Sequence, residues 1–74
     1  MRINTMYHAP ITLNGTPDRV LPGQTIATLL RERGLSPETV VVELNGHALT
    51  PSETKATPIQ SGDVLEVGAI VAGK

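Results

Sequence analysis

The sequence predicts an α+β domain in which a mixed sheet of four to five strands is covered by one main helix. Short alternating or β-branched runs, which are typical of strands, recur along the chain. Two Asn-Gly pairs, Asn14-Gly15 and Asn45-Gly46, indicate tight hairpins. A single amphipathic segment, residues 26–33, has helical spacing. Because 74 residues can build only one small core, the helix and the sheet must pack on each other.

Composition limits both the core and the chemistry. The chain has one aromatic residue, Tyr7, and no cysteine, so the core must be aliphatic and no thiolate site can form. A net charge of −1 without a basic stripe argues against nucleic acid as a partner. No apolar run approaches the ~20 residues of a membrane span. Met1–Thr5 lacks the apolar segment of a signal peptide, so the cytoplasm is the expected location.

The first predicted element is a hairpin. Its first strand should extend from residue 6 or 7 to residue 13, with Ile11 and Leu13 alternating toward the core. Asn14-Gly15 forms the turn, because both residues tolerate a positive φ. The return strand is expected at about residues 18–21.

The main helix is predicted over residues 26–33. Thr25 is a suitable N-cap, since its hydroxyl can accept a hydrogen bond from an amide of the first turn. Gly34 is placed for a left-handed C-cap. The helix is short and must therefore be stabilised by its apolar stripe, which consists of Ile26, Leu29 and Leu30.

The second half of the chain supplies the remaining strands. Val40–Leu44 is the most β-branched run and predicts a third strand, and a short strand follows the second Asn-Gly turn at His47–Leu49. Residues 50–60 are expected to form a connecting loop with room for one helical turn. The last strand is predicted over Val64–Val71, with Leu65 and Val67 pointing inward.

This order of elements predicts a β-grasp fold. Strands on either side of a crossover helix are usually parallel, which makes the first and last strands neighbours in the middle of the sheet. We expect residues 10–69 to form the domain. Residues 1–9 are expected to be a leader that can extend the first strand, and residues 70–74 a flexible C-terminal tail.

The polar residues do not suggest an active site. His8 and His47 lie too far apart in sequence to indicate a pair of metal ligands, and Glu43, Glu53 and Glu66 fall on separate elements. The serines lie in predicted loops without an evident base. We therefore expect no catalytic residues, no metal site and no bound cofactor in this chain.

Several segments together resemble the ThiS-type sulfur carriers, whose nearest relatives are the MoaD-type carriers. No single motif is specific, but the order and spacing match over about residues 10–74. The segments are Ile11–Gly15, Pro22–Leu30, Val41–Gly46, Gly62–Val67 and Ile70–Gly73.

The resemblance implies a ubiquitin-like sulfur carrier that catalyses nothing itself. In that family the C-terminal glycine carboxylate is adenylated by an E1-like, ThiF-type enzyme that uses ATP and Mg²⁺. Sulfur then replaces the adenylate, and the resulting thiocarboxylate delivers it to an acceptor enzyme. A ThiG-type thiazole synthase of thiamin biosynthesis is the expected acceptor, and molybdopterin or another sulfur-containing metabolite is the alternative pathway.

The same resemblance assigns the working terminus to Gly73, with Val71 and Ala72 as its lead-in. Lys74 departs from the family pattern, in which glycine is the last residue. Three explanations remain open: a peptidase removes Lys74, the sequence has been altered, or carrier chemistry has been lost. In the last case the chain is a non-catalytic ubiquitin-like interaction module with an inert tail.

A carrier also needs a surface on which its partners dock. The exposed side of the sheet is the expected location, because exposed apolar patches mark partner sites. Asp63 and Glu66 could steer a basic partner. The residues predicted to contact the partner are Val64, Glu66 and Ile70.

Overall fold

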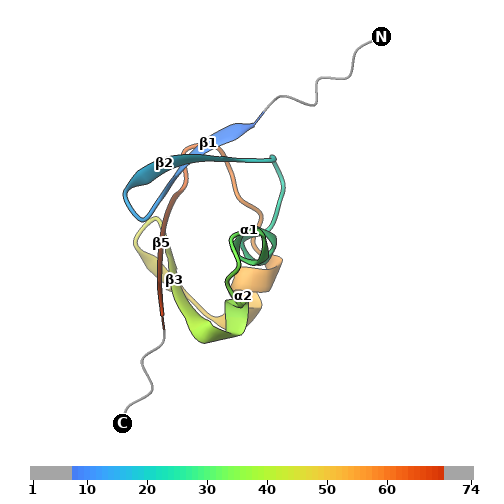
Figure 1. Ribbon diagram of the computed structural model, residues 1–74, viewed down its shortest axis with the longest axis vertical. Helices are drawn as coiled ribbons and strands as arrows, with labels where there is room; N and C mark the ends of the chain where they lie inside the picture. The colour runs from blue at the N-terminus through green and yellow to red at the C-terminus, as the bar shows by residue number, and fades with distance from the viewer. Residues whose placement is uncertain (1–7, 70–74) are drawn as a thin grey trace.

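The computed structural model describes residues 8–69 of the chain. Two segments named above, the leader up to residue 7 and residues 70–74, lie outside this range. The described residues form two helices, a 3-10 turn and a five-stranded sheet (Figure 1). In chain order these elements are β1 (Ala9–Leu13), β2 (Thr16–Val20), α1 (Ile26–Glu32), η1 (Pro37–Thr39), β3 (Val40–Leu44), β4 (His47–Leu49), α2 (Pro51–Ala56) and β5 (Val64–Ala69).

The sheet has the predicted β-grasp arrangement. Its strand order is β2-β1-β5-β3-β4, in which β1 and β5 are parallel and every other neighbouring pair is antiparallel. The first and last strands are therefore adjacent, and β5 is the central strand. Both helices lie on one side of the sheet (Figure 1). Neither helix of residues 8–69 has the length and apolar character that crossing a membrane requires.

Both Asn-Gly pairs form the expected turns. Asn14 and Gly15 have φ values of 52° and 79°, and Asn45 and Gly46 have 51° and 87°, as a type I′ hairpin turn requires. The return strand β2 begins at Thr16, two residues earlier than predicted. A two-residue turn sets Thr16 directly opposite Leu13, and Pro17 is tolerated because β2 is an edge strand.

Helix α1 follows its prediction to within one residue. The Thr25 hydroxyl accepts a hydrogen bond from the amide of Thr28 (3.2 Å) and caps the first turn. At the other end Gly34 has φ 79°, and the amide of Leu35 donates to the carbonyl of Leu30 (2.8 Å). This is the left-handed C-cap that the sequence predicts, in the form of a Schellman motif.

The segment expected to be a loop contains a second helix, α2. Thr50 and Glu53 form a capping box: the Glu53 amide donates to the Thr50 hydroxyl (3.1 Å), and the Thr50 amide donates to the Glu53 carboxylate (2.8 Å). Pro51 occupies the first helical position, where a missing amide proton has no cost. The buried Thr54 donates to the Thr50 carbonyl (3.1 Å), so its hydroxyl is satisfied.

The core lies between the helices and one face of the sheet, and it is aliphatic as predicted. The apolar stripe of α1 is completely buried, and Leu65 of β5 packs with it. Ile59, from the connection between α2 and β5, was not predicted to belong to the core. The buried core residues are Ala9, Ile11, Val20, Ile26, Leu29, Leu30, Val42, Ile59 and Leu65.

Candidate functional site

Strand β5 leads directly into the segment that the sequence predicts to be functional. Ala69 is the last residue of β5 and the last described residue of the chain. Five residues named in the sequence analysis lie outside the described range: Ile70, Val71, Ala72, Gly73 and Lys74.

The side chains of β5 alternate between the core and the open face of the sheet. Leu65 is fully buried, whereas Val64 is 41% exposed and Glu66 and Gly68 are also exposed. Such alternation follows from strand geometry, in which successive residues point to opposite faces. Val64 and Glu66, which were predicted to contact a partner, therefore lie on the surface that the helices do not cover.

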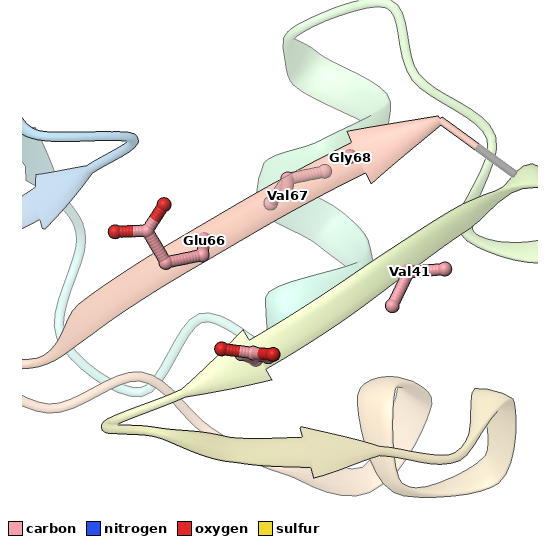
Figure 2. Close-up of a pocket in the computed structure, with 5 residues that line it drawn as sticks. Val41, Glu66, Val67 and Gly68 are labelled. Carbon is pink, nitrogen blue, oxygen red and sulfur yellow. The ribbon is translucent and has the colours of Figure 1, made fainter.

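Strand β3 adds two residues to this surface that sequence reasoning missed. Val41, which is 49% exposed, pairs with Gly68, and Glu43 pairs with Glu66 across the antiparallel ladder. The only sequence signal for them was the alternation within Val40–Leu44, and the register with β5 could not be read from it. Figure 2 shows Val41 on β3 across from the end of β5 that carries Val67 and Gly68, with Glu66 farther along β5.

A pocket lies over β3 and β5 on this side of the molecule (Figure 2). Its lining residues are two glutamates, two valines and a glycine; the Val67 side chain also packs against the core. We call this set the β3–β5 patch; it consists of Val41, Glu43, Glu66, Val67 and Gly68.

The two hairpin asparagines do more than turn the chain. The Asn14 side-chain oxygen accepts a hydrogen bond from the amide of Val67 (2.7 Å), beyond the point where β1 stops pairing with β5. The Asn45 side-chain oxygen accepts from the amide of Val64 (2.9 Å). Strand β5 is thus held by side chains from a turn on each side of it.

Asp63 is occupied within its own turn. One carboxylate oxygen accepts from the Asn45 side-chain amide (3.1 Å), and the other accepts from the backbone amide of Gln60 (2.8 Å). Asp63 was one of the two acidic residues expected to steer a basic partner. Its carboxylate instead stabilises the turn that precedes β5. Glu66 differs from Asp63 because its carboxylate lies on the open face of the strand itself.

Two surface ion pairs within residues 8–69 lie outside the β3–β5 patch. Arg33 contacts Asp18 at 3.0 Å and Lys55 contacts Glu38 at 2.9 Å. Hydrogen bonding and charge from Lys55 hold the pKa of Glu38 below its usual value. In the same range, no group of three or more histidine or acidic side chains is arranged to hold a metal ion.

A sequence model of the ThiS family matches residues 11–73. The chain belongs to the ThiS family. The sulfur carrier protein ThiS of Thermus thermophilus is 40% identical over 63 residues, which cover 85% of this chain and 97% of the relative.

Solved structures agree with this assignment. The crystal structure of the thiamine biosynthesis protein ThiS from Geobacter metallireducens superposes with a TM-score of 0.75 at 31% identity, covering 88% of this chain and 99% of that one. A computationally designed protein based on a human ubiquitin template matches with a TM-score of 0.50 at 28% identity, covering 90% and 95% of the two chains. The β-grasp fold of this ThiS-family chain is therefore shared with the ubiquitin shape.

The family match bears directly on the predicted terminus. It begins within β1, includes every other element of the sheet and ends at Gly73, so Lys74 lies beyond the matched residues. The ThiS pattern thus includes both strands of the β3–β5 patch and the residues that follow β5.

Proposed function

We propose that this ThiS-family chain is a sulfur carrier whose Gly73 carboxylate is adenylated and then converted to a thiocarboxylate. The observation that carries the proposal is the family match, which ends at Gly73. The relative named a sulfur carrier protein supports it, because it aligns over nearly its whole length.

The chemistry assigns all activation to a partner enzyme. A carboxylate is a poor electrophile, so it first attacks the α-phosphorus of ATP and displaces pyrophosphate to form an acyl-adenylate. Hydrosulfide, or a sulfur donor equivalent to it, then attacks the acyl carbon, AMP leaves and a proton is released. ATP and Mg²⁺ are bound by the adenylating enzyme, and the carrier contributes only its terminus.

Removal of Lys74 by a peptidase is part of this proposal. A lysine at the reacting residue would add a long side chain and a positive charge next to the carboxylate. Glycine has no Cβ and allows the closest approach of its backbone to a nucleotide. The chain ending at Gly73 is therefore the form we expect to react.

The proposed partners are a ThiF-type adenylating enzyme and, as sulfur acceptor, a ThiG-type thiazole synthase. The thiamine biosynthesis protein among the matched structures supports thiamin thiazole as the pathway. The requirement for ATP favours the cytoplasm as the place of reaction.

Intact-mass spectrometry tests the proposal. Chains ending at Gly73 and at Lys74 are incubated with the adenylating enzyme, ATP, Mg²⁺ and sulfide, and a chain ending at Ala72 is the control. We expect only the chain ending at Gly73 to gain the mass difference between one sulfur and one oxygen atom. If that chain remains unmodified while the enzyme activates a known carrier, the proposal is wrong.

A second candidate is a non-catalytic ubiquitin-like interaction module, which Lys74 favours because it follows the predicted reactive glycine. This candidate predicts that no form of the chain gains sulfur. A MoaD-type role predicts instead that the thiocarboxylate forms and is consumed by a molybdopterin-forming enzyme rather than by thiazole synthase.

A further inference from the structure

We propose that Asn14 is a site of spontaneous deamidation in the folded protein, whereas Asn45, in the same dipeptide and the same kind of turn, is protected. The reaction at Asn14 gives a mixture of aspartate and isoaspartate, and the isoaspartate form loosens the anchor of β5. This modification concerns the chemical ageing of the scaffold and is independent of sulfur transfer.

The reaction needs an asparagine followed by a residue with an accessible backbone nitrogen. The amide nitrogen of Gly15 attacks Cγ of Asn14, and the new C–N bond closes a five-membered imide. The bond from Cγ to the side-chain nitrogen breaks, and ammonia leaves with the proton that the glycine amide gives up. Water then opens the imide: attack at Cγ gives aspartate, and attack at the main-chain carbonyl gives isoaspartate. Glycine favours the ring closure because it has no Cβ to obstruct it.

The two Asn-Gly pairs offer the same nucleophile in nearly the same backbone. Each pair follows a leucine, both asparagines are exposed, and the φ values of Asn14 and Asn45 are 52° and 51°. No atom lies within 4 Å of the position that a Cβ would occupy at Gly15 or at Gly46, so both glycines are open on that side. A difference in reaction rate between the two turns is therefore assigned to the asparagine side chains.

Hydrogen bonds to these side chains distinguish the two positions. Within residues 8–69 the Asn14 side chain has a single bond, in which its oxygen accepts from the amide of Val67 (2.7 Å). The Asn45 side chain is held at both ends. Its oxygen accepts from the Val64 amide (2.9 Å), and its nitrogen, which is the leaving group, donates to the Asp63 carboxylate (3.1 Å). Because Cγ must turn toward the glycine nitrogen before the ring closes, Asn45 has to break two bonds and Asn14 only one.

The two products at position 14 have different effects on β5. An aspartate side chain keeps an oxygen within reach of the Val67 amide, so the anchor survives. Isoaspartate adds one carbon atom to the backbone of a turn that sets Leu13 directly opposite Thr16. It also leaves the carboxylate on a stem that is one carbon shorter. We expect both the two-residue turn geometry and the bond to Val67 to be lost in this form.

Deamidation at Asn45 would place a second carboxylate where the side chain now donates to Asp63. Two like charges at hydrogen-bonding distance repel each other. The bond that slows the reaction at Asn45 therefore also makes its product unfavourable, and we expect modified folded chains to carry the change at position 14.

Incubation of the folded protein at mildly alkaline pH, followed by tryptic peptide mapping, tests the assignment. Cleavage after Arg19, Arg33 and Lys55 places the two asparagines in different peptides, and fragment ions locate the mass gain that comes from replacing NH₂ by OH. We expect Asn14 to react about tenfold faster than Asn45 or more, because one hydrogen bond to a charged group changes an equilibrium by at least about that factor.

The same incubation in urea is the control. In the unfolded chain the two Leu-Asn-Gly sequences lose their side-chain hydrogen bonds and should react at similar rates. Equal rates in the folded protein, or a faster reaction at Asn45, would overturn the proposal. A preference for Asn14 that persists unchanged in urea would also overturn it, since that preference would come from local sequence and not from the fold.

The variant Asp63→Ala tests the protecting bond itself. It removes the acceptor of the Asn45 side-chain nitrogen and leaves the side-chain oxygen bonded to Val64. We expect the rate at Asn45 to rise toward that at Asn14, which is the reference within the same molecule. Circular dichroism checks that the variant is folded at the incubation temperature. An unchanged slow rate in the folded variant would refute protection by Asp63, and the comparison of folded and urea-treated wild type decides the matter if the variant does not fold.

Amide hydrogen exchange tests the consequence for β5. The aged chain with isoaspartate at position 14, isolated by chromatography, should exchange faster at Val67 than the fresh protein. Asn14→Asp is the matched control, because it carries the same charge without the longer backbone, and it should keep slow exchange at Val67. Equal exchange at Val67 in these two forms would rule out a loosened anchor.

Discussion

Asp18 is the charged residue whose environment is best defined. Its carboxylate accepts a hydrogen bond from the backbone amide of Arg19 (2.7 Å) and contacts the Arg33 guanidinium through both oxygens, each at 3.0 Å. The Arg19 amide, followed by the Arg33 side chain, lowers the pKa of Asp18 from the ordinary value of 3.8. This side chain thereby ties the edge strand β2 to the C-terminal cap of α1.

The lowered pKa predicts how Asp18→Asn will respond to pH. A carboxyl group with a lower pKa in the folded state stabilises the fold above its unfolded pKa, and this contribution is lost as the pH falls through the folded value. We therefore expect the variant to be less stable than the wild type at pH 7, by less than about 1 kcal/mol because the pair is partly exposed. The difference should disappear at acidic pH below the folded pKa.

Urea unfolding at a series of pH values measures this difference. Arg33→Gln is the informative comparison, because it removes the second cause of the shift and leaves the Arg19 amide in place. Part of the pH dependence should therefore survive in that variant. An equal loss of stability in Asp18→Asn at neutral and acidic pH would contradict the explanation.

At the scale of single elements, β5 depends on the two Asn-Gly turns that flank it. Asn14→Gly keeps the positive φ of the turn but removes the hydrogen bond to the Val67 amide. We expect a loss of about 1 kcal/mol, the usual net value of one such bond. Amide hydrogen exchange should show faster exchange at Val67.

Asn45→Gly is the matched control for this prediction. It has the same turn type and loses the bond from the Val64 amide, together with the bond that the Asn45 side chain donates to Asp63, and it keeps the bond at Val67. In Asn45→Gly we therefore expect faster amide exchange at Val64 and unchanged exchange at Val67. Unchanged protection of Val67 in Asn14→Gly would show that the hydrogen bond does not hold the strand.

The elements that could be predicted from sequence are those with strong local signals. The two Asn-Gly turns and the capped apolar stripe of α1 fixed four strands and the main helix to within a few residues. Helix α2 was predicted only as room for one helical turn in a loop, because the two prolines and the hydroxyl residues of residues 50–60 resemble loop composition. The Thr50–Glu53 capping box was the available signal for a helix. In the structure the capping box and the burial of Thr54 stabilise the helix despite this loop-like composition.

The candidate site could be predicted only in part, for a related reason. Alternation along the last strand placed Val64 and Glu66 on the exposed face. Val41 and Glu43 were missed because their proximity to β5 depends on the register between strands far apart in sequence. Gly73, Val71 and Ala72 remain predictions, since they lie outside the described residues.

For the molecule as a whole, one small core supports the inner face of β5 and leaves the other face open. Leu65 is fully buried among residues of the sheet and α1, so Leu65→Ala should cost about 2–5 kcal/mol. The free energy of unfolding of native domains is about 5–15 kcal/mol, so Leu65→Ala should remove a large fraction of the total stability. Val64→Ala, one residue earlier on the open face, should change stability by less than about 1 kcal/mol.

Circular dichroism with urea as denaturant compares these two variants. Similar losses at both positions would mean that the open face is covered in the free protein. A large loss only at Leu65 would agree with a sheet that is packed on one side.

The central position of β5 also has a consequence for synthesis. The β1–β2 and β3–β4 hairpins have no ladder with each other and are joined only through β5. A nascent chain on the ribosome that has not yet released residues 64–69 therefore cannot close its sheet, because the strand that joins its halves is missing. The sheet is therefore completed only when the strand next to the predicted reactive segment has been synthesised and released.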